Sequence, residues 1–101
     1  MYMKLVAFVS DYKMTVDTLD RLKPEKLGII LVQNGVYHAT TKEKGKPSSL
    51  LNYSADYYVL QEDLETRGLS GANVIDSKVK VIKFGDIVDL MFNEYDKTAW
   101  L

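Results

Sequence analysis

The chain has 101 residues, a net charge of −1 and no cysteine. This length suits one domain over residues 1–101, with a core large enough to need no disulfide. The absent thiols exclude disulfides, thiolate metal sites and cysteine nucleophiles. No apolar run reaches the ~20 residues of a bilayer span, and no signal peptide opens the chain. We therefore expect a cytoplasmic protein without membrane contact, and its scattered Lys and Arg residues argue against direct binding of nucleic acid.

Short apolar runs mark the expected strands. Continuous apolar sequence predicts strands that are covered on both faces. Such runs occupy residues 5–9, 27–32 and 57–60. Residues 79–82 predict a fourth strand, in which Lys80 indicates a less covered position, and residues 97–101 suit a short fifth strand.

Segments of other character separate these runs. Helices or helical turns are expected at residues 16–22, 36–39, 50–53, 61–67 and 86–95, and polar loops at 40–49 and 69–78. Pro24 ends the first helix, and Gly68 is the expected left-handed residue that closes the helix at 61–67. Alternating strands and helices form right-handed βαβ units. The expected fold is therefore α/β, a small three-layer α/β/α sandwich with a mainly parallel sheet of four to five strands.

The segment Gln33-Asn34-Gly35 follows the second strand, at the edge where open α/β sheets bind ligands. Asn-Gly is also an ordinary turn pair, because both residues tolerate positive φ. We interpret the segment first as such a turn. A subunit contact or a small-ligand site is the alternative.

Acidic residues begin the helix at 61–67. Glu62 and Asp63 lie in its first turn, where carboxylates favour the helix dipole, and Arg67 follows Asp63 at the spacing of a charge pair. His38 is the only histidine and is expected at the surface, so no metal site or acid/base pair is predicted. The acidic cluster is instead a candidate docking edge.

Trp100 is the only tryptophan and lies one residue from the end of the chain. A terminal aromatic residue frays unless it is docked. Trp100 therefore either packs back onto the domain or anchors an interface, where tryptophan is enriched. Tyr57 and Tyr58 indicate further, partly exposed aromatic surface that can join it.

Three segments carry a resemblance to a known family. They are the turn at 33–36, the block 60–64 with its continuation 67–69, and the ending from 87–90 to Trp100. In order and spacing they resemble the DsrH/TusB family of sulfur-relay subunits, within the DsrE/DsrF/DsrH-like superfamily. The resemblance implies a DsrE-like fold. It also implies a heterohexamer with DsrE/TusD-like and DsrF/TusC-like sister subunits, which passes persulfide sulfur to 2-thiouridine at the tRNA wobble position or serves sulfur oxidation.

The missing cysteine limits the role within such a relay. Sulfur transfer needs a thiolate that attacks a persulfide, and this chain offers none. We therefore expect a non-catalytic subunit, without a catalytic residue or cofactor, that works through protein contacts. Its candidate interface residues are Gln33, Asn34, Gly35, Tyr37, Gln61, Glu62, Asp63, Arg67 and Trp100.

A stand-alone, homo-oligomeric α/β domain that binds a small ligand or a protein is the alternative function. A phosphoacceptor receiver is excluded, because the third strand ends in Leu60-Gln61 rather than in the required aspartate. Hetero- and homo-oligomers, and the two sulfur pathways, stay open at this stage.

Overall fold

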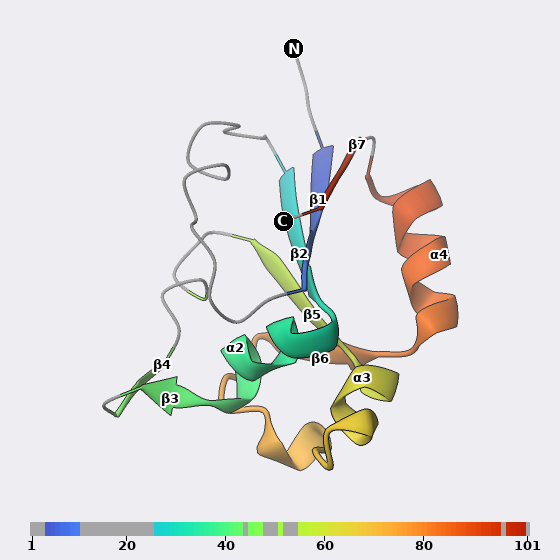
Figure 1. The fold of residues 1–101 in the computed structure, drawn as a ribbon. Coiled ribbons are helices and arrows are strands. Elements are labelled where there is room, and N and C mark those ends of the chain that lie inside the picture. The colour runs from blue at the N-terminus through green and yellow to red at the C-terminus, as the bar shows by residue number, and fades with distance from the viewer. Residues whose placement is uncertain are drawn as a thin grey trace.

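The computed structural model describes residues 4–10, 26–43, 45–47, 51, 55–95 and 97–100 (Figure 1). The predicted helix at 16–22 and Pro24 lie outside these residues, as does all of the predicted turn at 50–53 except Leu51. None of the helices in the described ranges has the length and apolar character that crossing a bilayer requires.

The centre of the molecule is a parallel sheet of five strands. These are β1 (Lys4–Val9), β2 (Lys26–Leu31), β5 (Asp56–Leu60), β6 (Val79–Ile82) and β7 (Lys97–Trp100). Their order is β6-β5-β2-β1-β7, and every neighbouring pair is parallel. All five predicted strands are therefore confirmed. The exposure expected at Lys80 is explained because β6 is an edge strand.

Short helical segments and one longer helix connect these strands. They are η1 (Gln33–Val36), α2 (Tyr37–Thr40), α3 (Gln61–Thr66), η3 (Gly71–Asn73) and α4 (Phe84–Asn93). Gly68 takes the predicted left-handed conformation after α3, with a φ of 70°. Helix α4 begins two residues before its predicted start. The Asp86 carboxylate accepts the backbone N–H of Lys83 at 3.0 Å, which makes Lys83 the N-cap of the helix.

Two predicted loops contain regular structure. The polar segment at 40–49 forms a small antiparallel hairpin of β3 (Lys42–Glu43) and β4 (Lys46–Pro47), and Gly45 reverses the chain with a φ of 77°. In the loop at 69–78, Ser70 caps η3 by accepting the N–H of Ala72 at 3.3 Å.

Each face of the sheet carries its own apolar core. One face packs against η1, α2 and α3 through residues that include Val36, Ala39 and Leu64. The other packs against α4 through Ile87 and Met91, and Figure 1 shows this helix running along that side of the sheet. Helices on both faces confirm the predicted three-layer α/β/α architecture.

Two sequence-based expectations about exposure are wrong. His38 is only 4% exposed, because α2 lies against the sheet between buried neighbours. Tyr57 is also buried, because β5 lies inside the sheet between β2 and β6. Tyr58, which is half-buried on the opposite face of β5, follows the prediction.

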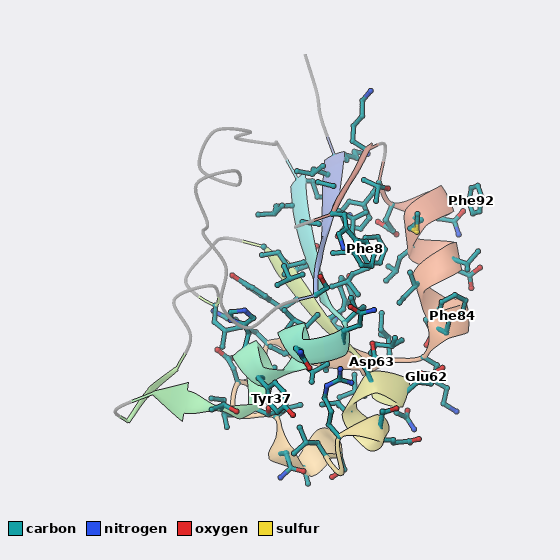
Figure 2. All side chains as sticks on the ribbon, viewed as in Figure 1. Phe8, Tyr37, Glu62, Asp63, Phe84 and Phe92 are labelled. Carbon is teal, nitrogen blue, oxygen red and sulfur yellow. The ribbon has the colours of Figure 1, made fainter. Side chains whose placement is uncertain are left out.

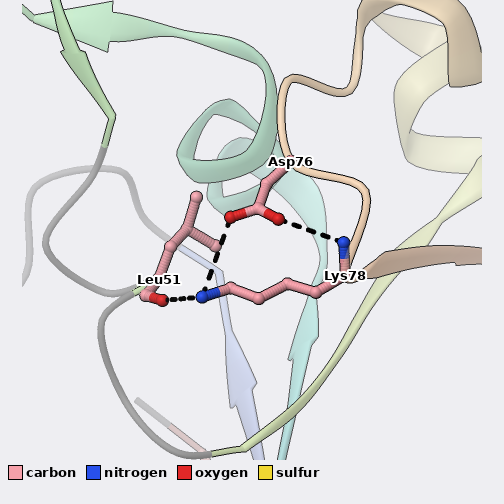
Figure 3. A network of polar contacts seen from close by, with 3 residues as sticks. All are labelled: Leu51, Asp76 and Lys78. Atoms are coloured by element: carbon pink, nitrogen blue, oxygen red, sulfur yellow. Dashed lines mark hydrogen bonds and ion pairs between the residues drawn. The ribbon is translucent and has the colours of Figure 1, made fainter.

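Lys78 joins Leu51 to the turn before β6 (Figure 3). Its ammonium donates to the carbonyl oxygen of Leu51 and lies 3.7 Å from the Asp76 carboxylate. The same ammonium lies 5.1 Å from the centre of the Tyr57 ring. One cation thus joins three parts of the chain on the α2 side of the sheet.

Tyr95 follows α4 and has a buried hydroxyl that makes no well-formed hydrogen bond with the described residues. Burial raises the pKa of this phenol above its ordinary value, and the nearby Tyr58 and Asp56 act in the same direction. A folded-state pKa above the unfolded one means that the folded state holds its proton longer. The stabilising contribution of the neutral Tyr95 phenol is therefore fully present below the pKa of the unfolded chain, about 10. It is lost as the pH rises further.

We expect the free energy of unfolding of the wild type to fall more steeply above pH ~10 than that of Tyr95→Phe. At neutral pH the variant should be as stable as the wild type or more stable, because the lost hydroxyl makes no well-formed hydrogen bond in the part of the chain that the structure describes. Urea unfolding at a series of pH values from neutral to alkaline measures both effects. Parallel pH profiles would contradict the buried, neutral phenol.

Candidate functional site

The carboxyl ends of β2 and β5 bring two of the predicted regions together. Parallel neighbouring strands end at the same edge of the sheet, so η1 after β2 lies beside α3 after β5. The backbone N–H of Gln33 donates to the Asp63 carboxylate at 2.6 Å. This charge-assisted bond holds the segment after β2 against the first turn of α3.

Arg67 strengthens the same junction, although not by the predicted charge pair. Its Nε and Nη2 donate to Oδ1 of Asn34, at 3.2 and 3.0 Å, and its Nη1 donates to the backbone oxygen of Asp63 at 3.1 Å. The carboxylate of Asp63 faces η1 instead, where it accepts from Gln33. The prediction of an ion pair between Asp63 and Arg67 is therefore wrong.

The turn after β2 also differs from the predicted Asn-Gly turn. The residue with positive φ is Gln33, at 49°, and neither Asn34 nor Gly35 shares this conformation. Gly35 is needed for space: a Cβ atom there would lie 1.9 Å from the carbonyl oxygen of Val9. The glycine thus allows η1 to pass directly over the end of β1.

We expect Asp63→Ala to lower the free energy of unfolding by about 1–2 kcal/mol, because it removes the charged acceptor of the Gln33 N–H. Asp63→Asn is the matched control, since its side-chain oxygen can still accept that bond, and should cost less than about 1 kcal/mol. Chemical denaturation of the three proteins measures the difference. Equal losses in both variants would mean that the negative charge, rather than the hydrogen bond, is what matters.

Glu62 connects α3 to the start of α4. Its carboxylate accepts the backbone N–H of Phe84 at 3.1 Å, one of the free donors at the start of that helix. The two first-turn acids of α3 therefore have different partners, with Asp63 bound to η1 and Glu62 bound to α4. Figure 2 shows both side chains at the end of the sheet, between η1 and α4.

A groove of about 510 Å³ opens beside α4 at this end of the sheet. Its walls are mainly apolar and come from β1, β7 and α4, with Phe8, Ile87 and Val88 among them. Trp100 forms one wall: its ring stacks on Phe8, with the ring centres 5.2 Å apart and the planes 21° apart. Gln33 and Asp63 supply polar atoms at one end.

Helix α4 also carries an exposed apolar row. Phe84, Val88 and Phe92 recur at every fourth residue, so they lie along one side of the helix. Phe84 is 63% exposed and Phe92 84% exposed, and Figure 2 shows both rings projecting from the helix. The sequence reasoning left Phe84 out of this row because the predicted helix began at Asp86.

The structure brings together only part of the predicted interface. Gln33, Asp63 and Trp100 line the groove, and Asn34, Gly35, Glu62 and Arg67 support its end. Two predicted residues lie elsewhere. Gln61 donates to Glu65 at 2.8 Å along α3, and Tyr37 projects from α2 on the side away from α4 (Figure 2).

Trp100 combines the two alternatives considered from the sequence, which were packing onto the domain and exposure at an interface. It packs back onto Phe8 and is still 63% exposed, so one side of its ring is docked and the other faces solvent. Among the residues that the structure describes, no three histidine or acidic side chains gather closely enough to hold a metal ion. The exposed side of the Trp100 ring and the apolar groove beside it are suited to contact with an apolar surface.

Comparison with known proteins agrees with the resemblance seen in the sequence. A family model described as "DsrH like protein" matches residues 9–97. The chain belongs to the DsrH-like family. It is 34% identical over 91 residues to Protein TusB of Yersinia pestis (strain Pestoides F), covering 90% of this chain and 93% of that relative. Protein TusB of Photorhabdus laumondii is 31% identical over the same shares of the two chains.

Two solved structures have a fold similar to that of this chain. Protein Tm0979 from Thermotoga maritima has a TM-score of 0.59 and 26% identity, covering 89% of this chain and 93% of that one. A protein of unknown function from Methanobacterium thermoautotrophicum, MTH1491, has a TM-score of 0.68 at 15% identity, covering 96% and 97%. At 15% identity, the similarity to MTH1491 concerns the fold alone.

Proposed function

We propose that this chain is a non-catalytic subunit of a sulfur-relay complex, in which it binds sister subunits that carry the persulfide cysteine. The observation that carries the proposal is that this chain belongs to the DsrH-like family and yet its sequence contains no cysteine. A persulfide is passed on only when a thiolate attacks its outer sulfur, so another chain must supply every thiol in the relay. The duty left to this chain is to hold and orient those subunits.

Two further observations support a contact role. The groove and the exposed row on α4 form an apolar surface, and such surfaces on small proteins mark interaction sites. The relatives carry the name TusB, which favours 2-thiouridine formation on tRNA over sulfur oxidation. DsrE/TusD-like and DsrF/TusC-like proteins are the proposed partners.

Co-expression with the DsrE/TusD-like and DsrF/TusC-like proteins of the same genome tests the proposal. We expect one complex of fixed stoichiometry by native mass spectrometry, with persulfide found only on the cysteine-bearing subunit after loading with a sulfur donor. Deletion of the gene should abolish 2-thiouridine in tRNA, and the intact gene should restore it. A covalent sulfur adduct on this chain, or no complex at all, would overturn the proposal.

A small-ligand-binding homo-oligomer is the second candidate. The groove of about 510 Å³ falls within the ~300–1,000 Å³ typical of ligand pockets, and it lies at the carboxyl end of a parallel sheet. The co-expression experiment separates the two functions. A closed homo-oligomer that does not combine with the sister proteins would favour this candidate.

A further inference from the structure

The groove and the exposed row form one surface, which we call the α4 face: Phe84, Val88, Phe92 and Trp100. Phe84, Val88 and Trp100 also line the groove, so the surface runs without interruption from the outside of α4 to the sheet edge. At their observed exposures these side chains present on the order of 500 Å² of largely apolar surface. That is near the upper end for the largest patch on a monomer, ~300–600 Å².

Acidic side chains lie at one end of the groove and on the other flank of α4. Glu62 and Asp63 lie at the end of the groove, where their carboxylates accept only backbone N–H groups in the described structure. On the other side of α4, Asp86 and Asp89 line a smaller hollow of about 290 Å³. None of these four acids has an ion-pair partner among the described residues.

We propose that the α4 face binds a segment of a different protein chain that presents apolar anchor side chains with Lys or Arg beside them. The inference rests on the proposed function and adds to it the docking face and the chemistry of the partner. Apolar anchors fill the groove next to Trp100, and the cations lie opposite the acids at its end and along α4. Such an arrangement of an apolar centre and a complementary charged rim is typical of specific interfaces.

The same charges argue against the other occupants. A second copy related by a two-fold axis would set the α4 face against itself, and among its described residues this face offers no cation opposite Glu62 and Asp63. A small molecule could fill the groove, but it would leave the Phe92 ring exposed beyond it. A protein segment is the occupant that covers the whole surface.

Affinity measurements on the full chain and its purified sister pair test the inference. Phe84→Ser and Phe92→Ser should each weaken binding about tenfold or more, as loss of an aromatic anchor does. Ile75→Ser is the matched control. Ile75 is an exposed apolar residue that donates its N–H to Ala39 beside α2, away from the α4 face, and its substitution should change the dissociation constant less than twofold. Unchanged melting temperatures would show that the variants fold.

A second variant tests the charges. Glu62→Gln keeps the acceptor for the Phe84 N–H, and Asp89 has no hydrogen bond in the described structure, so Glu62→Gln with Asp89→Asn removes charge alone. We expect the double variant to bind about three- to tenfold more weakly at low salt, with the difference shrinking as salt screens the charges.

The outcomes separate this inference from the proposed function. Weaker binding of both phenylalanine variants, with the control unchanged, supports the α4 face. A complex that tolerates Phe84→Ser and Phe92→Ser overturns the face alone, and one that tolerates the charge variant at every salt concentration overturns the cationic partner. If the wild type forms a homodimer and Phe92→Ser dissociates it, the surface binds a second copy of this chain instead. Absence of any complex overturns the proposed function, and this inference with it.

Discussion

Gly35→Ala should unfold the protein or lower its free energy of unfolding by about 3 kcal/mol or more, which corresponds to a drop in melting temperature of roughly 12 °C or more. The new methyl group would lie 1.9 Å from the carbonyl oxygen of Val9 and 2.7 Å from its carbonyl carbon. That oxygen already accepts the N–H of Val32 at 3.0 Å, so neither backbone segment can move without breaking the junction. Both neighbouring atoms are main-chain atoms at the end of β1, so no side chain can move to make room.

Gly85→Ala is the matched control for this prediction. Gly85 lies in the first turn of α4, and no atom lies within 4 Å of a Cβ built there. Alanine should therefore stabilise the protein by about 0.5–1 kcal/mol, through its higher helix propensity. Thermal and urea unfolding of both variants measures the contrast. A loss below about 1 kcal/mol for Gly35→Ala would mean that η1 and the end of β1 are farther apart than the structure places them.

Trp100→Ala should weaken binding of the sister subunits by about thirtyfold, or about 2 kcal/mol, because tryptophan is the side chain that most often dominates an interface. The Trp100 ring is a wall of the groove and faces solvent on the side away from Phe8. The free chain should lose only about 1 kcal/mol of stability, since one stacked aromatic pair at the sheet edge is removed. Isothermal titration with the sister pair and urea unfolding of the free chain measure the two effects.

Trp100→Phe is the control that shows how much of the effect of Trp100→Ala comes from loss of an aromatic ring. It keeps an aromatic ring against Phe8 and should recover most of the lost affinity. If Trp100→Ala lowers stability strongly and leaves the affinity unchanged, Trp100 is a core residue at the end of the chain. The α4 face would then be limited to Phe84, Val88 and Phe92 on the helix.

Local sequence was sufficient for the strands and for most of the helices. The runs that became β1, β2 and β5 are continuously apolar, and the structure buries them between two layers of helices. Gly68 marked the end of α3 correctly, because its conformation depends on its own missing side chain. The boundary of α4 was harder to predict. Its start depends on the Asp86 carboxylate turning back to Lys83, which the apolar periodicity does not encode.

Features that depend on neighbours distant in sequence were missed or misread. Gly35 was interpreted through its own φ, whereas its role comes from the approach of β1. His38 was placed at the surface, because nothing in its local sequence says that the sheet lies beneath α2. Asp63 was paired with Arg67 four residues on. The parallel pairing of β2 with β5 offers it the N–H of Gln33 instead.

By itself, the sequence determined the α/β class, the family and the impossibility of a thiol-based step in this chain, because each depends only on residue identity and order. The tertiary structure decided where the candidate surface lies. Parallel pairing of β7 with β1 brings Trp100 onto Phe8 from opposite ends of the chain, and α4 covers the sheet beside them. Surfaces of this kind arise from strand order and helix rotation, and those are set by packing across the whole sheet rather than by local periodicity.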